Sequence, residues 1–445
     1  MDGRVTRNPT VPRGWIGATT PSIPRHSALQ RLPHARECSN GGVSSATTGK
    51  DAVYPTSVYW DPRLLQYDFG DYHPMSPTRL DATMRLVQNL GLDSAPNVRV
   101  TVPEVPDDPV LELVHTKTYV QSVRAVSEDP TRQIPECGLG TEDTPGYEGI
   151  HESSARLVGG SYQGAADLLS GSVVHAVNFG GGMHHAAADK ASGFCVYNDC
   201  AVAIQHLLNN GVQRVLYVDV DGHHGDGTQS IFYDEPRVMT VSLHETGLSL
   251  FPGTGFANEI GSGAAAGTAV NVAMPTRADD SQWLRAYDAV VPPIAREFRP
   301  EVIVSQHGCD SHFQDELTHL RMSVDGQRQI ALAVSELAAE LCEGRWIATG
   351  GGGYDCHDAV PRSWAHLVGV ASGYPVDVNT PVPQAWRSYM AEKYGGRPPE
   401  RMGDDVDIWW RSWEIGYDPS DETDRSIMAT RKEVFPQWGL DPWYD

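Results

Sequence analysis

The sequence is poor in basic residues, and this shortage narrows the classes of partner that it can bind. Its 445 residues include 34 Lys and Arg against 57 Asp and Glu, which gives a formal net charge of −23. Because nucleic-acid binding needs a basic face, this balance argues against DNA or RNA as a partner. It remains compatible with a basic protein segment or with a substrate that carries an amine.

The sequence also lacks paired cysteines and long apolar runs. The seven cysteines form no C-x-x-C pair, and an odd number with such spacing fits a reducing compartment better than a disulfide framework. No apolar run approaches the length of a membrane span, and the N-terminus has no signal-peptide core. We therefore expect a cytoplasmic protein that makes no contact with a membrane.

Composition divides the chain into three parts. Residues 1–52 are rich in Arg, Pro, Ser, Thr and Gly and show little apolar periodicity, so we interpret them as a disordered tail. Residues 53–382 have globular composition and are long enough to bury a sizeable core. Residues 383–445 are rich in Trp and acids, and we expect them to form an appendage packed on the domain.

Strand-like and helix-like segments alternate through the globular part, a pattern typical of an α/β fold with a mostly parallel sheet. The placement of the strand at 269–274 within that sheet is left open. The sequence predicts strands at 57–60, 97–102, 173–179, 214–220, 238–243, 269–274, 302–306 and 346–349, and helices at 79–90, 115–126, 153–169, 199–209, 281–291 and 327–342.

The most informative stretch is residues 215–227, where a buried strand leads into an acidic, glycine-rich segment. Asp219, Asp221 and His223 alternate at period two, so they project toward one side if the strand continues. Two carboxylates and an imidazole beside a buried apolar run need compensation for their desolvation, and a divalent metal supplies it. The alternative is an acidic strand end followed by a solvated loop.

Polar residues follow five of the predicted strands, and the carboxyl ends of parallel strands meet at one edge of a sheet. Asp221, His223 and Asp310 supply two carboxylates and one imidazole, which suits a catalytic ion with an open position. Zinc is the first choice, and ferrous iron fits the same donors. Cys309 should point away from its neighbour Asp310 and serve in packing.

The tandem histidines His184 and His185 suit a general base and an electrostatic partner. Each needs a carboxylate to fix its tautomer, and Asp219 and Asp226 are the spare acids. Tyr354, after four glycines, could present its hydroxyl to a developing oxyanion. The alternatives are an ordinary histidine pair and a tyrosine packed in a turn.

At this point the motifs resemble those of the metal-dependent histone deacetylase family. The resemblance covers about residues 54–370. Within the family the chain is most similar to the bacterial acetoin-utilisation deacetylases, through YDFG at 67–70, QHGCD at 306–310 and the Trp-rich tail. The family motifs are GGMHHA at 181–186, SGFCVYND at 192–199, DVDGHHGDG at 219–227, FPGTG at 251–255 and GGGGY at 350–354.

The resemblance implies a three-layer α/β/α arginase–deacetylase fold and hydrolysis of N-acetyl-lysine in proteins, with release of acetate. It implies that His185, paired with Asp226, is the general base and acid, and that His184, paired with Asp219, steadies the transition state. Tyr354 would bind the acetyl oxygen. The implied metal ligands are Asp221, His223 and Asp310.

The resemblance also implies a substrate tunnel and a second cation. Phe194 and Phe251 would form the walls of the tunnel, Gly193 and Leu317 would line it, and Asp143 would hold the substrate backbone at its rim. An acyl-CoA synthetase is the partner that the acetoin-utilisation branch suggests. A structural potassium ion would lie near Asp219, Asp221, His223, Ser242 and Leu243.

Two features of the sequence leave alternatives open. Gly222 stands where family members carry a bulkier aliphatic residue, so this segment could be locally looser. The tunnel mouth cannot be drawn from sequence, so an acetylpolyamine or other small-molecule amidohydrolase on the same fold is an alternative function. A catalytically silent acetyl-lysine-binding protein is a second, although retention of His184, His185 and Tyr354 speaks against it. An arginase-like two-metal site would need further Asp-x-His-x-Asp clustering, which the sequence lacks.

Overall fold

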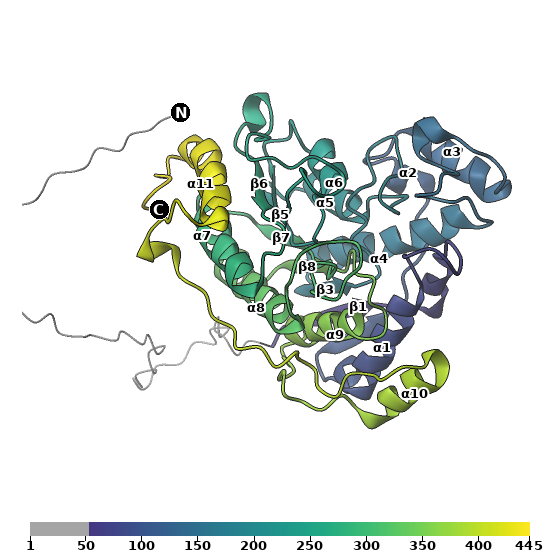
Figure 1. Ribbon diagram of the computed structural model, residues 1–445. Coiled ribbons are helices and arrows are strands. Elements are labelled where there is room, and N and C mark those ends of the chain that lie inside the picture. Colours follow the sequence, from purple (N-terminus) through teal and green to yellow (C-terminus); the bar gives the residue numbers. More distant parts are fainter. Residues whose placement is uncertain (1–52) are drawn as a thin grey trace, which may run out of the picture. The chain divides into compact units, whose positions relative to one another are not determined.

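The computed structural model describes residues 53–445 of the chain (Figure 1). The tail expected at 1–52 lies outside the described residues. The strands are β1 Thr56–Tyr59, β2 Val98–Thr101, β3 His175–Asn178, β4 Val215–Asp219, β5 Val238–Glu245, β6 Ala269–Met274, β7 Val302–Gln306 and β8 Trp346–Thr349. The helices are α1 Thr78–Asn89, α2 Asp108–Leu111, α3 Lys117–Glu128, α4 Ile150–Ser170, α5 Asp199–Asn209, α6 Asp226–Ile231, α7 Asp280–Phe298, α8 Val324–Leu341, α9 Ala359–Ala371, α10 Gln384–Tyr394 and α11 Glu422–Val434.

The eight strands form one sheet in the order β2-β1-β3-β8-β7-β4-β5-β6, and every pairing between them is parallel. This confirms the prediction of a parallel sheet. The strand at 269–274, whose place was open, is the edge strand β6 beside β5. A parallel sheet gathers the carboxyl ends of its strands on one edge, and this edge carries the site described below.

Helices cover both faces of the sheet, which gives the three-layer α/β/α arrangement expected from the family resemblance (Figure 1). Helices α4 and α5 pack on one face, and α1, α7, α8 and α9 lie on the other. Strand β4 shows why the sequence folds this way. Val215 and Tyr217 point into the core under α4 and α5, and Leu216 and Val218 point into the opposite core, so its apolar run is buried on both sides.

Two sequence predictions need correction. Strand β4 ends at Asp219, so the metal-binding residues that follow lie in a loop rather than on a continued strand. Helix α7 does not end at Val291 but continues through Pro292 and Pro293 to Phe298. Proline disfavours a helix interior, but Ile294 and Phe298 are buried, and their packing offsets that cost.

The C-terminal residues contact the rest of the described chain at several points. The Nε1 of Trp386 on α10 donates a 2.9 Å hydrogen bond to the carbonyl of Ala82 on α1. Helix α11 packs against β6 and α7, where Asp424 pairs with Arg285. The sequence predictions did not include α9, α10 or α11. None of the helices within residues 53–445 has both the length and the hydropathy needed to cross a bilayer.

Candidate metal-dependent active site

Three metal-binding side chains meet at the carboxyl edge of the sheet, and all three are buried. Asp221 and His223 lie in the loop after β4, and Asp310 follows β7. The Nδ1 of His223 lies 2.8 Å from Oδ2 of Asp310 and 3.3 Å from Oδ1 of Asp221. Ligands about 2.1 Å from a tetrahedral zinc ion lie about 3.4 Å apart. The separation between His223 and Asp221 has this length, and the separation between His223 and Asp310 is shorter and lies in the range of a hydrogen bond.

The outer oxygens of both carboxylates are already engaged, which turns the inner oxygens toward His223. Oδ2 of Asp221 accepts hydrogen bonds from Nε2 of Gln306 (2.6 Å) and from the backbone N–H of Gly352 (2.8 Å). Oδ1 of Asp310 accepts one from the N–H of Gly222 (2.6 Å). The ligand set is therefore oriented by protein contacts before any ion binds.

The charges of this cluster also favour a cation. Burial and the charge of Asp221 raise the pKa of Asp310 to about 6. Against the effect of burial, Asp310 and Asp221 raise the pKa of His223 to about 10. A divalent ion that replaces the proton of His223 would neutralise two adjacent buried carboxylates more fully. Two carboxylates and one imidazole without thiolate fit zinc or ferrous iron. Among residues 53–445, this is the one group of at least three His, Cys, Asp or Glu side chains with such spacing.

Gly222 allows the two halves of the metal site to approach closely. A Cβ at this position would lie 2.7 Å from Cγ2 of Thr318 and 2.9 Å from Oδ1 of Asp310. The sequence suggested that this glycine could loosen the segment. In the structure it instead permits tight packing of one ligand loop on the other.

The tandem histidines are buried beside the metal-binding residues, and each contacts its own carboxylate. The Nδ1 of His184 lies 2.8 Å from Asp219, and the Nδ1 of His185 lies 2.7 Å from Asp226. A carboxylate can only accept, so both Nδ1 atoms carry a proton and each Nε2 is the atom free to gain or lose one. The two rings are 4.0 Å apart between centroids.

The electrostatics of the two histidines differ. Burial, and the charge of His184, lower the pKa of His185 to about 4, so His185 is a neutral base at pH 7. Burial on its own would lower the pKa of His184, but the charges of Asp219 and Asp221 raise it to about 9. The pair therefore combines a proton acceptor with a positive charge in one pocket.

Tyr354 enters the same pocket from the glycine run after β8, and it lines this pocket together with His184, His185 and Asp221. Its backbone N–H donates a 2.8 Å hydrogen bond to Oδ2 of Asp315. Burial and nearby carboxylates hold the pKa of its hydroxyl well above the usual range. The hydroxyl therefore stays protonated and can donate a hydrogen bond to an oxyanion.

Three of the five expected tunnel residues lie against His185 or Tyr354. The Phe251 ring is 5.1 Å from the His185 ring, and the Phe194 ring is 5.9 Å from that of Tyr354, measured between centroids. Gly193 packs so tightly that a Cβ there would lie 2.3 Å from Cδ2 of His185.

The other two expected tunnel residues contact neighbours of the site. The carbonyl of Asp143 lies 3.3 Å from Nε2 of His73, whose ring packs on Phe194. The N–H of Leu317 donates to Asp315, which also holds Tyr354. Both residues are partly buried.

The residues of the expected potassium site lie on the adjacent strands β4 and β5 and in the loop that follows β4. Asp219 at the end of β4 pairs in register with Ser242 on β5, and Leu243 follows it. The N–H of Asp221 donates to Oδ1 of Asp219. The Oγ of Ser242 lies 2.8 Å from Nδ1 of His244. These contacts leave the potassium ion a prediction.

Several supporting residues escaped the sequence reasoning. Gln306 binds Asp221, and the hydroxyl of Tyr217 donates a 2.7 Å hydrogen bond to Asp219. The buried carboxylate of Asp199 accepts the N–H groups of Gly182 and Met183 just before the histidines. Polar side chains at the carboxyl end of an otherwise apolar strand were the available signal for Gln306 and Tyr217.

Comparisons with known proteins agree with this geometry. Residues 73–371 match the histone deacetylase domain. The chain is 38% identical over 389 residues to the acetoin utilization protein AcuC of Bacillus subtilis (strain 168), an alignment that covers 86% of this chain and 98% of that protein. It is 36% identical over 362 residues to AcuC of Staphylococcus aureus (strain MSSA476), covering 78% and 90%, and 37% identical over 314 residues to AcuC of Staphylococcus xylosus, covering 70% and 81%.

Proposed function

The chain belongs to the histone deacetylase family of hydrolases, and we propose that it removes the acetyl group from N-acetyl-lysine in proteins by metal-dependent hydrolysis. One observation carries the proposal. Two histidines, each paired with its own carboxylate, lie in a single buried pocket with Asp221 and with Tyr354. This is the set of groups that amide hydrolysis needs: a base, an electrostatic partner and an oxyanion donor.

In the proposed mechanism, Asp221, His223 and Asp310 would hold a divalent ion, which would supply Lewis-acid polarisation for a water molecule and for the acetyl carbonyl. Nε2 of His185 takes the proton of the attacking water, and Asp226 stabilises the imidazolium that forms. The hydroxyl of Tyr354 donates to the acetyl oxygen as negative charge develops there. His185 then returns the proton to the lysine nitrogen, and acetate and the free amine leave.

The aromatic rings beside the histidines and the tyrosine, and a nearby carboxylate, support a peptide that carries acetyl-lysine as the substrate. Phe194 and Phe251 offer aromatic faces for the apolar stem of a lysine side chain, and Asp143 offers a carboxylate for the backbone of a peptide. We propose zinc as the ion, with ferrous iron as the alternative, and a structural potassium ion beside Asp219 and Ser242. The relatives' role in acetoin utilization suggests an acyl-CoA synthetase as the acetylated partner and a cytoplasmic site of action.

The test is turnover of an acetyl-lysine peptide by the zinc-loaded parent and by His185→Ala. We expect the variant to lose at least about 100-fold in kcat because general-base catalysis supplies a factor of this order. It should keep its zinc, since His185 is a base and not a ligand. The matched control is His206→Ala on α5, which should retain turnover.

Two outcomes would overturn the proposal. A zinc-loaded parent that hydrolyses N-acetylputrescine but not the peptide would favour the polyamine alternative. A parent that binds the peptide without turnover would favour the silent binding protein.

A further inference from the structure

The three metal-binding residues come from two separate segments, and their spacing depends on how these segments are held. Asp221 and His223 share the loop after β4, whereas Asp310 comes from the segment between β7 and α8. The 2.8 Å separation between Nδ1 of His223 and Oδ2 of Asp310 therefore spans the two segments. A side chain that fixes the second segment controls the position of the third ligand.

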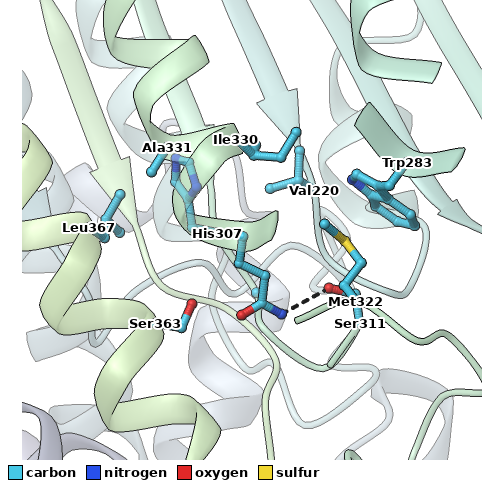
Figure 2. Close-up of a pocket in the computed structure, with 11 residues that line it drawn as sticks. Val220, Trp283, His307, Ser311, Met322, Ile330, Ala331, Ser363 and Leu367 are labelled. Atoms are coloured by element: carbon cyan, nitrogen blue, oxygen red, sulfur yellow. Dashed lines mark hydrogen bonds between the residues drawn. The ribbon is translucent and has the colours of Figure 1, made fainter. Parts of the chain in front are cut away.

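Gln327 in the first turns of α8 contacts both neighbours of Asp310. Its Nε2 lies 3.0 Å from the carbonyl of Cys309 and 3.1 Å from Oγ of Ser311, and the bond to Ser311 is the dashed line in Figure 2. A carbonyl oxygen can only accept, so the atom that faces it must be the amide nitrogen. One amide group thus holds the residue before the ligand and the residue after it.

The acceptor side of this contact is buried, whereas Gln327 itself is partly exposed. Cys309 and Ser311 are buried, and Trp283, Ile330 and Met322 surround the same small pocket (Figure 2). Removing the Gln327 donor would take one hydrogen bond from each of these two buried residues. The other restraints on this segment include backbone hydrogen bonds at Cys309 and Ser311, the bond from the N–H of Gly222 to Oδ1 of Asp310, and the bond from Oγ1 of Thr318 to the carbonyl of Asp310.

We propose that Gln327 is a positioning residue for the metal site: by holding Cys309 and Ser311 it sets the placement of Asp310 and thereby the affinity for the divalent ion. The inference rests on the proposed function for the identity of the site. The inference predicts a change in the affinity for zinc, which can be measured without any substrate.

The variant Gln327→Met keeps the length of the side chain and removes the donor. We expect its zinc affinity, measured by competition with a chromophoric chelator, to fall about tenfold, as for other residues that orient metal ligands. The melting temperature of the metal-free protein should stay close to the parent value. At saturating zinc, kcat for an acetyl-lysine peptide should return to within about threefold of the parent.

A double-mutant cycle tests whether the contact itself is responsible. Ser311→Ala removes one of the two acceptors, and we expect a smaller loss of zinc affinity than in Gln327→Met. The double variant should bind zinc about as well as Gln327→Met alone, because both changes remove the same bond. Gln329→Met on the same helix is the matched control and should bind zinc like the parent.

Zinc affinity within twofold of the parent in Gln327→Met would overturn the inference, as would strictly additive losses in the cycle. If Gln327→Met does not fold, Ser311→Ala decides, and unchanged zinc affinity there would contradict the proposal. A parent that binds zinc but does not hydrolyse the peptide would contradict the proposed function and leave this inference standing.

Discussion

Tyr354 is held both by its backbone and by packing of its ring. Its N–H binds Asp315, and its ring packs edge-on against Phe194 at the entrance of the pocket. The carboxylates of Asp310 and Asp221 add to the effect of burial and keep its hydroxyl protonated. The tyrosine therefore has one chemical task in this account, which is to donate a hydrogen bond to the acetyl oxygen.

Replacing Tyr354 with Phe removes that donor and keeps the ring. We expect kcat for an acetyl-lysine peptide to fall about 100- to 1,000-fold, or about 3–4 kcal/mol of transition-state stabilisation. Zinc content and thermal stability should match the parent. Turnover within a few-fold of the parent, at full zinc content, would remove Tyr354 from the mechanism.

At the level of single residues, sequence reasoning named the three side chains that the structure brings together as a candidate metal site, but not the residues that support them. Asp221, His223 and Asp310 stood out because charged groups beside buried apolar runs need compensation. Gln306, Asp315 and Gln327 did not stand out, because an amide or a carboxylate is also common on surfaces. Their role depends on which loop lies opposite, and that information is three-dimensional.

Helix α11 is joined to α7 by a buried ion pair. Arg285 donates to both carboxylate oxygens of Asp424, and the two side chains are 4% and 0% exposed. Arg285 also donates to the carbonyls of Arg411 and Ser412. Removing one partner of such a pair lowers the stability of the protein by more than the net contribution of the pair, because the other charge stays buried without a partner.

The variant Asp424→Ala leaves the Arg285 charge without its partner. We expect the free energy of unfolding, measured with urea, to fall by about 3–5 kcal/mol. Glu422→Ala on the same helix breaks only the exposed pair with Arg425 and should cost less than about 1 kcal/mol. Equal effects of the two changes would show that α11 contributes little to the fold.

Asp404 links the C-terminal segment to α8 and α9 and makes stability depend on pH. Burial opposes its ionisation, but hydrogen bonding to His312 and the charge of Arg362 hold the pKa of Asp404 well below its usual range. The folded pKa lies below the unfolded value of about 3.8. This contribution is therefore fully present above about pH 4 and is lost as the pH falls toward the folded pKa.

We expect Asp404→Asn to be less stable than the parent by about 2 kcal/mol at pH 7. The difference should be the same at pH 5 and smaller at pH 3.5, because Asp404 then begins to take up a proton in the unfolded chain while it stays ionised in the folded protein. Urea unfolding of both proteins at the three pH values measures it. A difference that grows on acidification would contradict the assignment.

At the level of elements, periodicity and strand composition predicted the sheet well. Strands β6, β7 and β8 and helix α5 have the predicted bounds because caps and glycines mark their ends. The errors arose where tertiary packing overrides local preference. Helix α7 passes two prolines because its apolar side chains pack into the core. Strand β4 stops at Asp219, because the next residues turn to bring Asp221 and His223 toward Asp310.

For the whole molecule, all proposed catalytic and metal-binding residues lie within residues 53–445, and the composition of residues 1–52 predicts a tail that buries little apolar area. A chain that begins at Val53 should therefore match the full chain in melting temperature and in kcat. A chain that ends at Val382 should be much less stable, because it loses the buried side chains of Trp386, Ile427 and Phe435. A large loss of stability in the first truncation, or none in the second, would contradict the expected division of the chain.

The central claim is that this chain hydrolyses acetyl-lysine with an ion held by Asp221, His223 and Asp310. The most direct test measures acetate release from an acetyl-lysine peptide by the parent before chelation, after chelation and after return of zinc, with Asp310→Ala alongside. We predict that release stops on chelation and returns with zinc, and that Asp310→Ala neither retains zinc through dialysis nor releases acetate. Release that persists in the chelated parent, or in Asp310→Ala, would contradict the account.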